Sequence, residues 1–442
     1  MNDILWNLLL LSVPGLPLLL AFPPLHSRLP WFRYLAVTPA IIVALMSMTY
    51  SIELSWLLFG IGLGIDGQAQ LLLGVSALLW IAVATLFSRK TSNSKAVNNL
   101  ISSLFMLTMA GSFGAILATD LVGFFVFSTL MGYGFYGLLI AGDDLHHQTR
   151  RAARIYLVAM IIADVMLFEV LLITALVTEN MSFAMAHQGI AQSDYLTLYL
   201  WLVVFGFALK AGIWPLHFWL IAVYRHLGSA MAILLCGVPV IIALLGMLRW
   251  LPLGETSSIT TGVTLQGIGL IGLLYTCFLI FFEWLKNRSF TMITVYTMLL
   301  ASGLFIIAIG TGLTDATTWI RYENSVYYFI ALLSLALAIL LALTIRLQQH
   351  HTTTTATQVD DNTAMWFERW PATAVAWAGN IGSHTLPEWR SGWLAKVNHL
   401  GLLVCVWKRS LAANERNLQG WTVAITLFLT LAAIITLLLI FH

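Results

Sequence analysis

The stretch YLTLYLWLVVFGFALKAGIWPLHFWLIAVY, residues 195–224, decides how this chain folds. It is long and apolar enough to cross a membrane as a helix, and its one lysine, Lys210, lies near the middle. Gly212 and Pro215 follow shortly after the lysine. Because proline removes a backbone donor and clashes with the preceding turn, the helix is expected to break here. Inside a membrane such a break is tolerated only against protein or water.

Lys210 is a candidate ion or proton site. An ammonium at bilayer depth costs at least about 2.5 kcal/mol, so it is rarely present without a role. The alternative is that its side chain snorkels to an interface or pairs structurally with a buried acid. Long uncharged segments flank Lys210 on both sides, His217 excepted, which makes an interface hard to reach.

The composition of the whole chain agrees with a membrane protein. It is 60% hydrophobic and only 9% charged, with a mean hydropathy of +0.90 and a net charge of +2. A soluble domain carries about 25% charged residues, so soluble enzymes and nucleic-acid-binding proteins are excluded. The first apolar run lacks a basic n-region and a cleavage site, so no cleavable signal peptide is expected. The fold class is therefore an all-α polytopic membrane protein.

Runs of about 20 apolar residues predict twelve spanning helices, the seventh broken and continued by a half-helix to residue 224. They are expected near residues 4–23, 31–52, 69–88, 98–118, 120–141, 153–177, 195–213, 229–250, 260–284, 290–312, 324–346 and 419–441.

The basic residues test this count. With the N-terminus outside, all of the 21 lysines and arginines except Arg249, Arg321 and Lys210 fall on the inner side. This is the pattern of the positive-inside rule. It supports twelve spans with both termini on the outer side, because a missed or extra span in the middle would scramble the alternation.

The region after the eleventh span is different in character. Residues 347–387 contain HHTTTTATQVDDN and read as a cytoplasmic linker. Residues 388–413 place tryptophan, valine and leucine at three- and four-residue spacing, which predicts an amphipathic helix on the inner face, against lipid or a neighbouring subunit. The expected division is 1–60 for the N-terminal spans, 61–312 for a core, 313–346 for one further span, the linker, and 388–442 for the amphipathic helix and last span.

The sixth predicted span carries two carboxylates, Asp164 and Glu169. They point about 140° apart on a helix, so one of them can face Lys210 while the other faces a different neighbour. The alternative for Asp164 is a structural hydrogen bond to an adjacent helix. His217 either relays protons between Lys210 and water or satisfies carbonyls freed by the break. Asp120 is positioned to cap the fifth span.

Chemistry that needs a bound group is not indicated. Cys236, Cys277 and Cys405 lie far apart without metal or disulfide spacing. No nucleotide, haem or zinc motif is present in the sequence. We therefore expect no cofactor and no metal, and no redox reaction by this chain alone.

LKAGIWPLHFWLIAVYRHLGSAMAILLCG, residues 209–237, resembles the signature of the antiporter-like proton-translocating subunits of respiratory complex I, Mrp cation/proton antiporters and membrane-bound hydrogenases. Lys210 matches the central lysine of that family, and Pro215 and His217 match its broken-helix motif. GIDG at 64–67 and ATDLVGFFVFSTLMG at 118–132 resemble further family segments. Asp164 matches an acidic position in the sixth helix.

The chain also departs from the family pattern. Thr129 stands where the resemblance implies the acid that pairs with the lysine, and Cys236 stands where it implies a histidine. The lysine of the eighth helix is missing, and no mid-span lysine marks a second half-channel. About two of the family's helices are missing as well. We therefore expect a shortened member with one proton half-site at Lys210, in which Glu169 replaces the lost acid.

The resemblance implies a subunit of a larger complex in the bacterial inner membrane that moves protons or Na⁺. It is not expected to be catalytic alone, and it would contact other membrane subunits through 388–413. One alternative is a subunit for proton-gradient-driven inorganic-carbon uptake or for cation/proton antiport. Another is a degenerate scaffold subunit without an ion path of its own.

Overall fold

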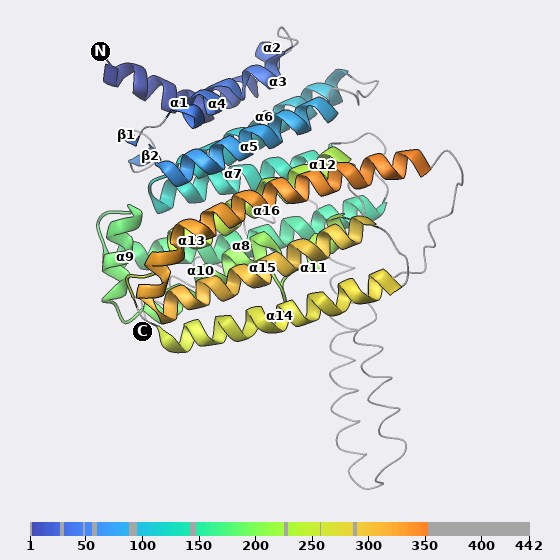
Figure 1. Cartoon of the computed structure of the whole chain (residues 1–442). Coiled ribbons are helices and arrows are strands. Elements are labelled where there is room, and N and C mark those ends of the chain that lie inside the picture. The colour runs from blue at the N-terminus through green and yellow to red at the C-terminus, as the bar shows by residue number, and fades with distance from the viewer. Residues whose placement is uncertain are drawn as a thin grey trace, which may run out of the picture. The chain divides into compact units, whose positions relative to one another are not determined.

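The computed structural model describes residues 2–351 apart from 27–30, 47–48, 55–59, 88–94, 142–146, 225–228, 257 and 286–289. These residues belong to one compact unit, Met1–Thr353, in which long helices lie side by side with similar axes (Figure 1). The linker expected over 347–387 lies outside the described residues beyond His351. So do the amphipathic helix expected at 388–413 and the last span.

The N-terminal part holds four helices and a β-hairpin. The helices are α1 (Asn2–Leu20), α2 (Pro23–His26), α3 (Phe32–Leu35) and α4 (Thr38–Leu45). In the hairpin, β1 (Tyr50–Leu54) pairs antiparallel with β2 (Ile61–Ile65). The hairpin corrects the end of the span predicted over 31–52, where residues 50–52 belong to β1, and the prediction of a purely helical fold. In β1 the central Ile52 is buried while its neighbours are exposed, and averaging hydropathy over a long window hides such alternation.

Twelve helices follow the hairpin within the described part of the chain. They are α5 (Gly67–Phe87), α6 (Lys95–Leu117), α7 (Leu121–Ile140), α8 (His147–Val177), α9 (Phe183–Ala191), α10 (Leu196–Ala211), α11 (Phe218–Tyr224), α12 (Ser229–Gly237), α13 (Pro239–Trp250), α14 (Ile259–Leu285), α15 (Phe290–Thr314) and α16 (Ala316–His351). Eight helical segments of the described part are long and apolar enough to cross a membrane. Three shorter apolar segments, at 4–20, 32–45 and 196–211, correspond to further predicted spans.

The helical path is interrupted twice near the centre of the bundle. Gly212 ends α10 in the left-handed conformation, with φ 65° and ψ 41°, which glycine adopts without steric cost. Helix α11 then begins at Phe218. The Trp219 indole donates to the Leu209 carbonyl at 2.7 Å and so ties α11 back onto α10. Pro239 starts α13 immediately after α12, where its missing N–H leaves no helical partner unsatisfied.

Helices α7, α8, α10 and α13 pack on one another. Phe124, Phe207 and Trp250 form an edge-to-face aromatic cluster there, with ring centroids 5.4–6.2 Å apart. Such close packing excludes water from the surrounding side chains. Helix α14 lies at the edge, packs against α15, and exposes a large apolar face elsewhere (Figure 1). The large apolar side chains exposed on it are Ile259, Val263, Leu270, Ile271, Leu274, Phe278 and Phe281.

Candidate functional site

An ion pair lies inside the bundle between α10 and α8. Lys210 is on the last turn of α10, and its Nζ lies 2.6 Å from Asp164 Oδ1 on α8. Both side chains are buried, with exposed fractions of 7% and 4%. Two opposite charges in such a place stabilise each other, and removing either one leaves an uncompensated buried charge.

Helix α7 completes the site from a third side. Lys210 Nζ donates to Ser128 Oγ at 3.3 Å, while Thr129 Oγ1 donates to Asp164 Oδ1 at 3.3 Å. Tyr133, one turn further along α7, also has a side-chain hydrogen bond to Asp164. Residues four apart share one face of a helix, so Thr129 and Tyr133 approach the carboxyl together. The ion pair therefore has neutral hydroxyl partners on both of its charges.

A small cavity adjoins the lysine. Its volume of about 10 Å³ is room for about one water molecule. Tyr156 borders it, and the Tyr156 hydroxyl donates to the Gly132 carbonyl at 3.2 Å. The other lining residues are mostly apolar and comprise Ser128, Met131, Gly132, Met160, Phe207, Lys210, Pro239, Ile242 and Ala243. A water in this space would meet the ammonium and the Ser128 hydroxyl.

Glu169 is placed differently from the expectation that it faces Lys210. It is buried on α8 with an exposed fraction of 4%, and its Oε1 has no hydrogen-bond partner in the part of the chain that the structure describes. Asp164 occupies the place beside the ammonium instead. The acid of the pair therefore comes from α8. Thr129 of α7, at the position where the resemblance implies an acid, donates a hydrogen bond to Asp164 instead.

His217 lies at the start of the segment that follows the break. It is 3% exposed, and its ring centroid is 5.6 Å from that of Tyr275 on α14. Its Nδ1 has no hydrogen-bond partner among the described residues, and no described hydrogen bond joins it to Lys210. The structure thus brings His217 to α14, next to the break, rather than to the ion pair.

Two further positions singled out in the sequence have local roles. Asp120 caps α7 by accepting from Gly123 N at 2.6 Å, and its other oxygen accepts from Gly62 N of β2 at 2.7 Å. Asp120 thus fastens the hairpin to the end of α7. Cys236 lies on α12. No group of three or more metal-binding side chains occurs within the described ranges.

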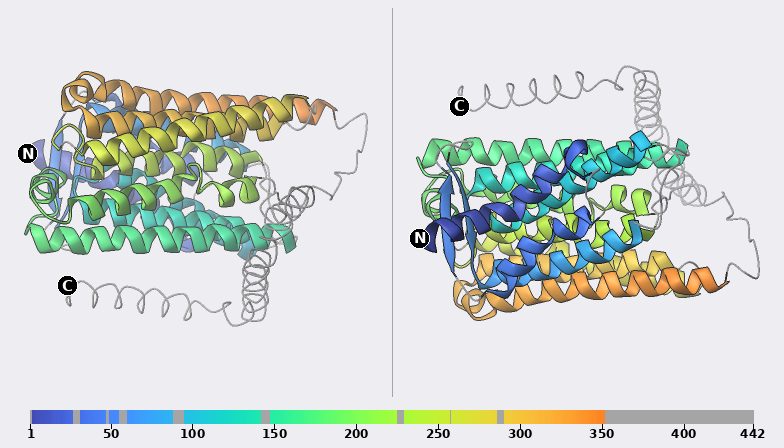
Figure 2. Two further views of the ribbon diagram at one scale, coloured as in Figure 1. Left: turned by 90° about the horizontal axis from the view of Figure 1, so that it is seen from below. Right: turned by 90° about the horizontal axis from the view of Figure 1, so that it is seen from above.

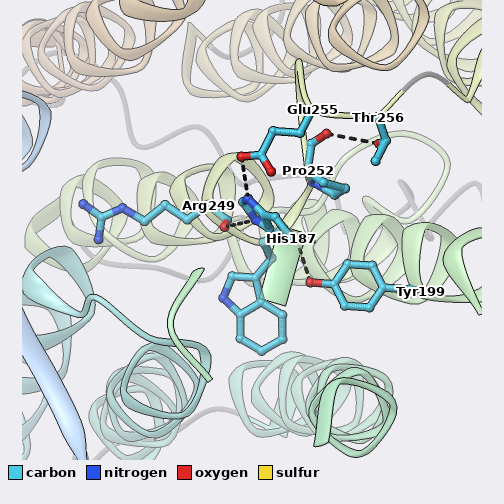
Figure 3. Close-up of polar contacts among 7 residues, drawn as sticks. His187, Tyr199, Arg249, Pro252, Glu255 and Thr256 are labelled. Atoms are coloured by element: carbon cyan, nitrogen blue, oxygen red, sulfur yellow. Dashed lines mark hydrogen bonds and ion pairs between the residues drawn. The ribbon is translucent and has the colours of Figure 1, made fainter. Parts of the chain in front are cut away.

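A polar cluster at the hairpin end of the bundle escaped the sequence reasoning (Figure 3). His187 of α9 contacts the Arg249 carbonyl at 3.0 Å and Glu255 Oε1 at 3.4 Å. The Arg249 Nη1 donates to the Ile116 and Ala118 carbonyls at 2.7 and 3.0 Å, where α6 ends. One signal was present in the sequence, because Arg249 is one of the two basic residues placed on the outer side.

This cluster borders an open cleft of about 830 Å³. The cleft is walled by the hairpin, the start of α5, the end of α6, α9, the end of α13 and the start of α16. Its charged or ionisable residues are Asp66, His187, Arg249, Glu255, Glu323, Tyr50 and Tyr327.

Residues 118–413 match the family described as "NADH:quinone oxidoreductase/Mrp antiporter, TM". The chain is 28% identical over 271 residues to a probable K(+)/H(+) antiporter component of Rhizobium meliloti (strain 1021), covering 58% of this chain and 47% of that protein. It is 25% identical over 287 residues to an NADH-quinone oxidoreductase component of Escherichia coli (strain K12), covering 62% and 54%. The chain thus spans about half the length of these relatives.

Solved structures show the same fold. The Mrp complex from Dietzia sp. DQ12-45-1b matches with a TM-score of 0.58 and 20% identity, over 76% of this chain and 62% of that chain. The membrane-bound sulfane sulfur reductase, described as an archaeal respiratory membrane complex, matches with a TM-score of 0.62 and 17% identity, over 76% and 69%.

Proposed function

Because the chain belongs to the NADH:quinone oxidoreductase/Mrp antiporter transmembrane family, we propose that it moves protons across a membrane through the buried Lys210–Asp164 pair. The observation that carries the proposal is the 2.6 Å contact between these two buried side chains. A buried ion pair gives stability only weakly compared with an apolar pair of similar size. Its presence within a membrane-spanning bundle therefore favours a functional use.

The surroundings favour the proton over Na⁺ as the transported ion. The Asp164 carboxylate is already neutralised by an ammonium, which repels a second cation. The adjoining cavity has room for about one water molecule and a mostly apolar lining. A metal cation would need several oxygen ligands in place of its water shell, whereas a proton needs only one acceptor.

A proton can move within the site by short steps. Its transfer from Lys210 Nζ to Asp164 Oδ1 leaves both groups neutral, which the apolar surroundings tolerate. The Thr129 and Tyr133 hydroxyls hold the carboxyl in place, and Ser128 is the second polar neighbour of the ammonium. Water entering the cavity beside Lys210 would then reload the amine from one side of the membrane. Release of the proton from Asp164 to water on the other side would complete the transfer and restore the charged pair. Movement of α10 at the break after Gly212 is suited to change which side this is.

The wider setting of the proposal comes from the sequence and the relatives. We place the chain in a bacterial inner membrane as a twelve-span subunit with a broken seventh helix, both termini outside. Relatives named as K(+)/H(+) antiporter and NADH-quinone oxidoreductase subunits support other membrane subunits as its partners. The segment 388–413 is our candidate for that contact. A cation/proton antiporter complex is the second candidate setting, favoured by the name of the Rhizobium relative.

Proton flux in liposomes tests the role of the pair. The tagged full chain is purified with its co-purifying subunits, reconstituted, and followed with a pH-sensitive dye. Lys210→Met and Asp164→Asn should each lower the flux at least about tenfold, because each removes one of the two groups that exchange the proton. Lys210→Arg should also be inactive, because a guanidinium does not release its proton in this pH range.

Two variants complete the design. Glu169→Gln distinguishes the role of Glu169 from that of Asp164. It should leave flux near the wild-type level, because Asp164 is the acid that contacts the ammonium. Glu53→Gln, at an exposed position of β1, is the control for a lost surface charge. Wild-type flux in both Lys210→Met and Asp164→Asn would refute the proposal and leave the scaffold role.

A further inference from the structure

His187 lies between two groups that can only accept hydrogen bonds. Its Nε2 is 3.0 Å from the Arg249 carbonyl oxygen, and its Nδ1 is 3.4 Å from Glu255 Oε1 (Figure 3). A carbonyl and an ionised carboxylate both lack a hydrogen to donate. Neutral imidazole carries one N–H, so it can serve only one of these partners. Both contacts become hydrogen bonds when the ring is doubly protonated.

The two contacts join elements that differ in how firmly they are held. The end of α13 is fixed, because the Arg249 guanidinium donates to the end of α6 and the Tyr199 hydroxyl donates to the Trp250 carbonyl at 2.7 Å. Glu255 lies beyond this point, in the 251–256 turn closed by Thr256 Oγ1 on the Pro252 carbonyl at 3.2 Å. Its side chain is 48% exposed, whereas that of His187 is 11% exposed. The His187–Glu255 contact is thus a link from the buried side of α9 to the one exposed residue of a turn whose other residues are buried or half-buried.

Both partners of this link line the 830 Å³ cleft at the hairpin end. The link therefore joins two walls of the cleft, α9 and the 251–256 turn. Losing it would leave the Glu255 carboxylate free to turn into the cleft or into solvent.

We propose that His187, the Arg249 carbonyl and Glu255 form a proton-operated latch, here called the His187 latch. The latch ties α9 to the 251–256 turn when the imidazole is charged, and it releases Glu255 when the imidazole is neutral. Histidine is the side chain that makes this change between about pH 5 and 8. Acidification on this face of the protein closes the latch, and alkalinisation opens it. The latch lies apart from the Lys210–Asp164 pair, and it stands whether or not that pair conducts protons.

The other ionisable groups around the latch do not replace its partners. The Arg249 guanidinium is directed to the carbonyls that end α6, and Tyr199 of α10 is bound to the Trp250 carbonyl. The last turn of α8, which packs against α9, carries no ionisable residue, and Glu179 follows it. Asp194 follows α9 itself. Across the cleft lie Tyr50, Asp66, Glu323 and Tyr327.

Hydrogen exchange of the purified full chain, read by mass spectrometry at about pH 6 and pH 8, tests the latch. The backbone amides of the turn are suitable reporters, because those of Gly254, Glu255 and Thr256 are hydrogen-bonded to Gly312 and Pro252 carbonyls. After correction for the intrinsic pH dependence of exchange, we expect their protection to be at least about threefold greater at pH 6.

Two variants should abolish this pH dependence. In His187→Gln the side-chain amide cannot gain or lose a proton, so the protection of the turn should be the same at both pH values. In Glu255→Gln the new amide group can donate to neutral Nδ1, so the turn should be protected at both. Glu53→Gln on β1 is the matched control and should keep the wild-type ratio.

The outcomes decide the proposal. A wild-type protein without the pH-dependent protection would overturn it, and so would a His187→Gln variant that retains it. If His187→Gln fails to fold, Glu255→Gln alone still decides, because a surviving wild-type ratio in that variant would show that the carboxylate is not the partner.

Discussion

Lys210 and Asp164 depend on each other for stability as well as for proton transfer. Asp164→Asn leaves a buried ammonium whose remaining described partner is the Ser128 hydroxyl, and we expect a loss of about 3–5 kcal/mol in the free energy of unfolding. The double variant Asp164→Asn/Lys210→Met removes the stranded charge and should recover most of that loss. Thermal unfolding of the purified chain in detergent measures both. Additive losses in the double variant would show that the two side chains are not coupled.

The residues of this pair could be predicted from the sequence only in part. Lys210 was found because a lone ammonium in a long apolar segment is unusual, and Gly212 and Pro215 marked the end of the helix. The sequence analysis expected Glu169 opposite Lys210, whereas Asp164 makes the contact, because the choice depends on how α8 is rotated against α10. That rotation is set by the packing of apolar side chains along the whole interface, as where Leu167 lies close to Gly206.

At the scale of the helices, α14 and α15 approach each other closely through paired glycines. A Cβ on Gly262 or Gly310 would lie 2.7 Å from the carbonyl oxygen of the other, and a Cβ on Gly269 would lie 2.8 Å from the Gly303 carbonyl oxygen. The glycines are seven residues apart on each helix, so the two contacts match in an antiparallel pair. Small residues at such positions let membrane helices pack backbone to backbone.

Gly269→Ala should therefore loosen the α14–α15 pair. We expect a loss of about 1–3 kcal/mol, because the added methyl cannot be accommodated without moving backbone atoms. Gly267→Ala on the same helix is the control, since nothing lies within 4 Å of its Cβ, and it should be neutral or stabilising by up to about 1 kcal/mol. Thermal unfolding of the two variants gives the comparison. Equal unfolding temperatures would mean that the close approach does not limit stability.

The helices were the easier elements to predict. Each span is a long apolar run, so its existence follows from composition even where its ends shift by several residues. The hairpin and α9 were missed, because their stability comes from contacts with other segments rather than from their own pattern. The Gly62 amide is held by Asp120, and Leu121 N is bound to the Met181 carbonyl just before α9. The glycines of α14 and α15 are visible in the sequence, but which glycine meets which is not.

At the scale of the whole molecule, the two ends of the bundle differ in charge and structure. The hairpin, α9 and the cleft lie at one end, as both views of Figure 2 show for the strands and α9. The last turn of α8 lies at the hairpin end, beside α9. Arg150, Arg151 and Arg154 lie in the first turns of α8 and therefore at the opposite end. By the positive-inside rule, the end of the bundle that carries these arginines is expected to face the cytoplasm and the hairpin end to face outward.

Labelling of single cysteines tests that orientation. In a background lacking Cys236, Cys277 and Cys405, Glu53→Cys on β1 should react in intact cells with a membrane-impermeant maleimide, because it is exposed at the hairpin end. Arg150→Cys on α8 should react only after the membrane is permeabilised, because basic residues close to the ends of membrane spans are retained on the inner side. The reverse pattern would show that the hairpin end faces the cytoplasm. The cleft and the His187 latch would then sense the cytoplasmic pH.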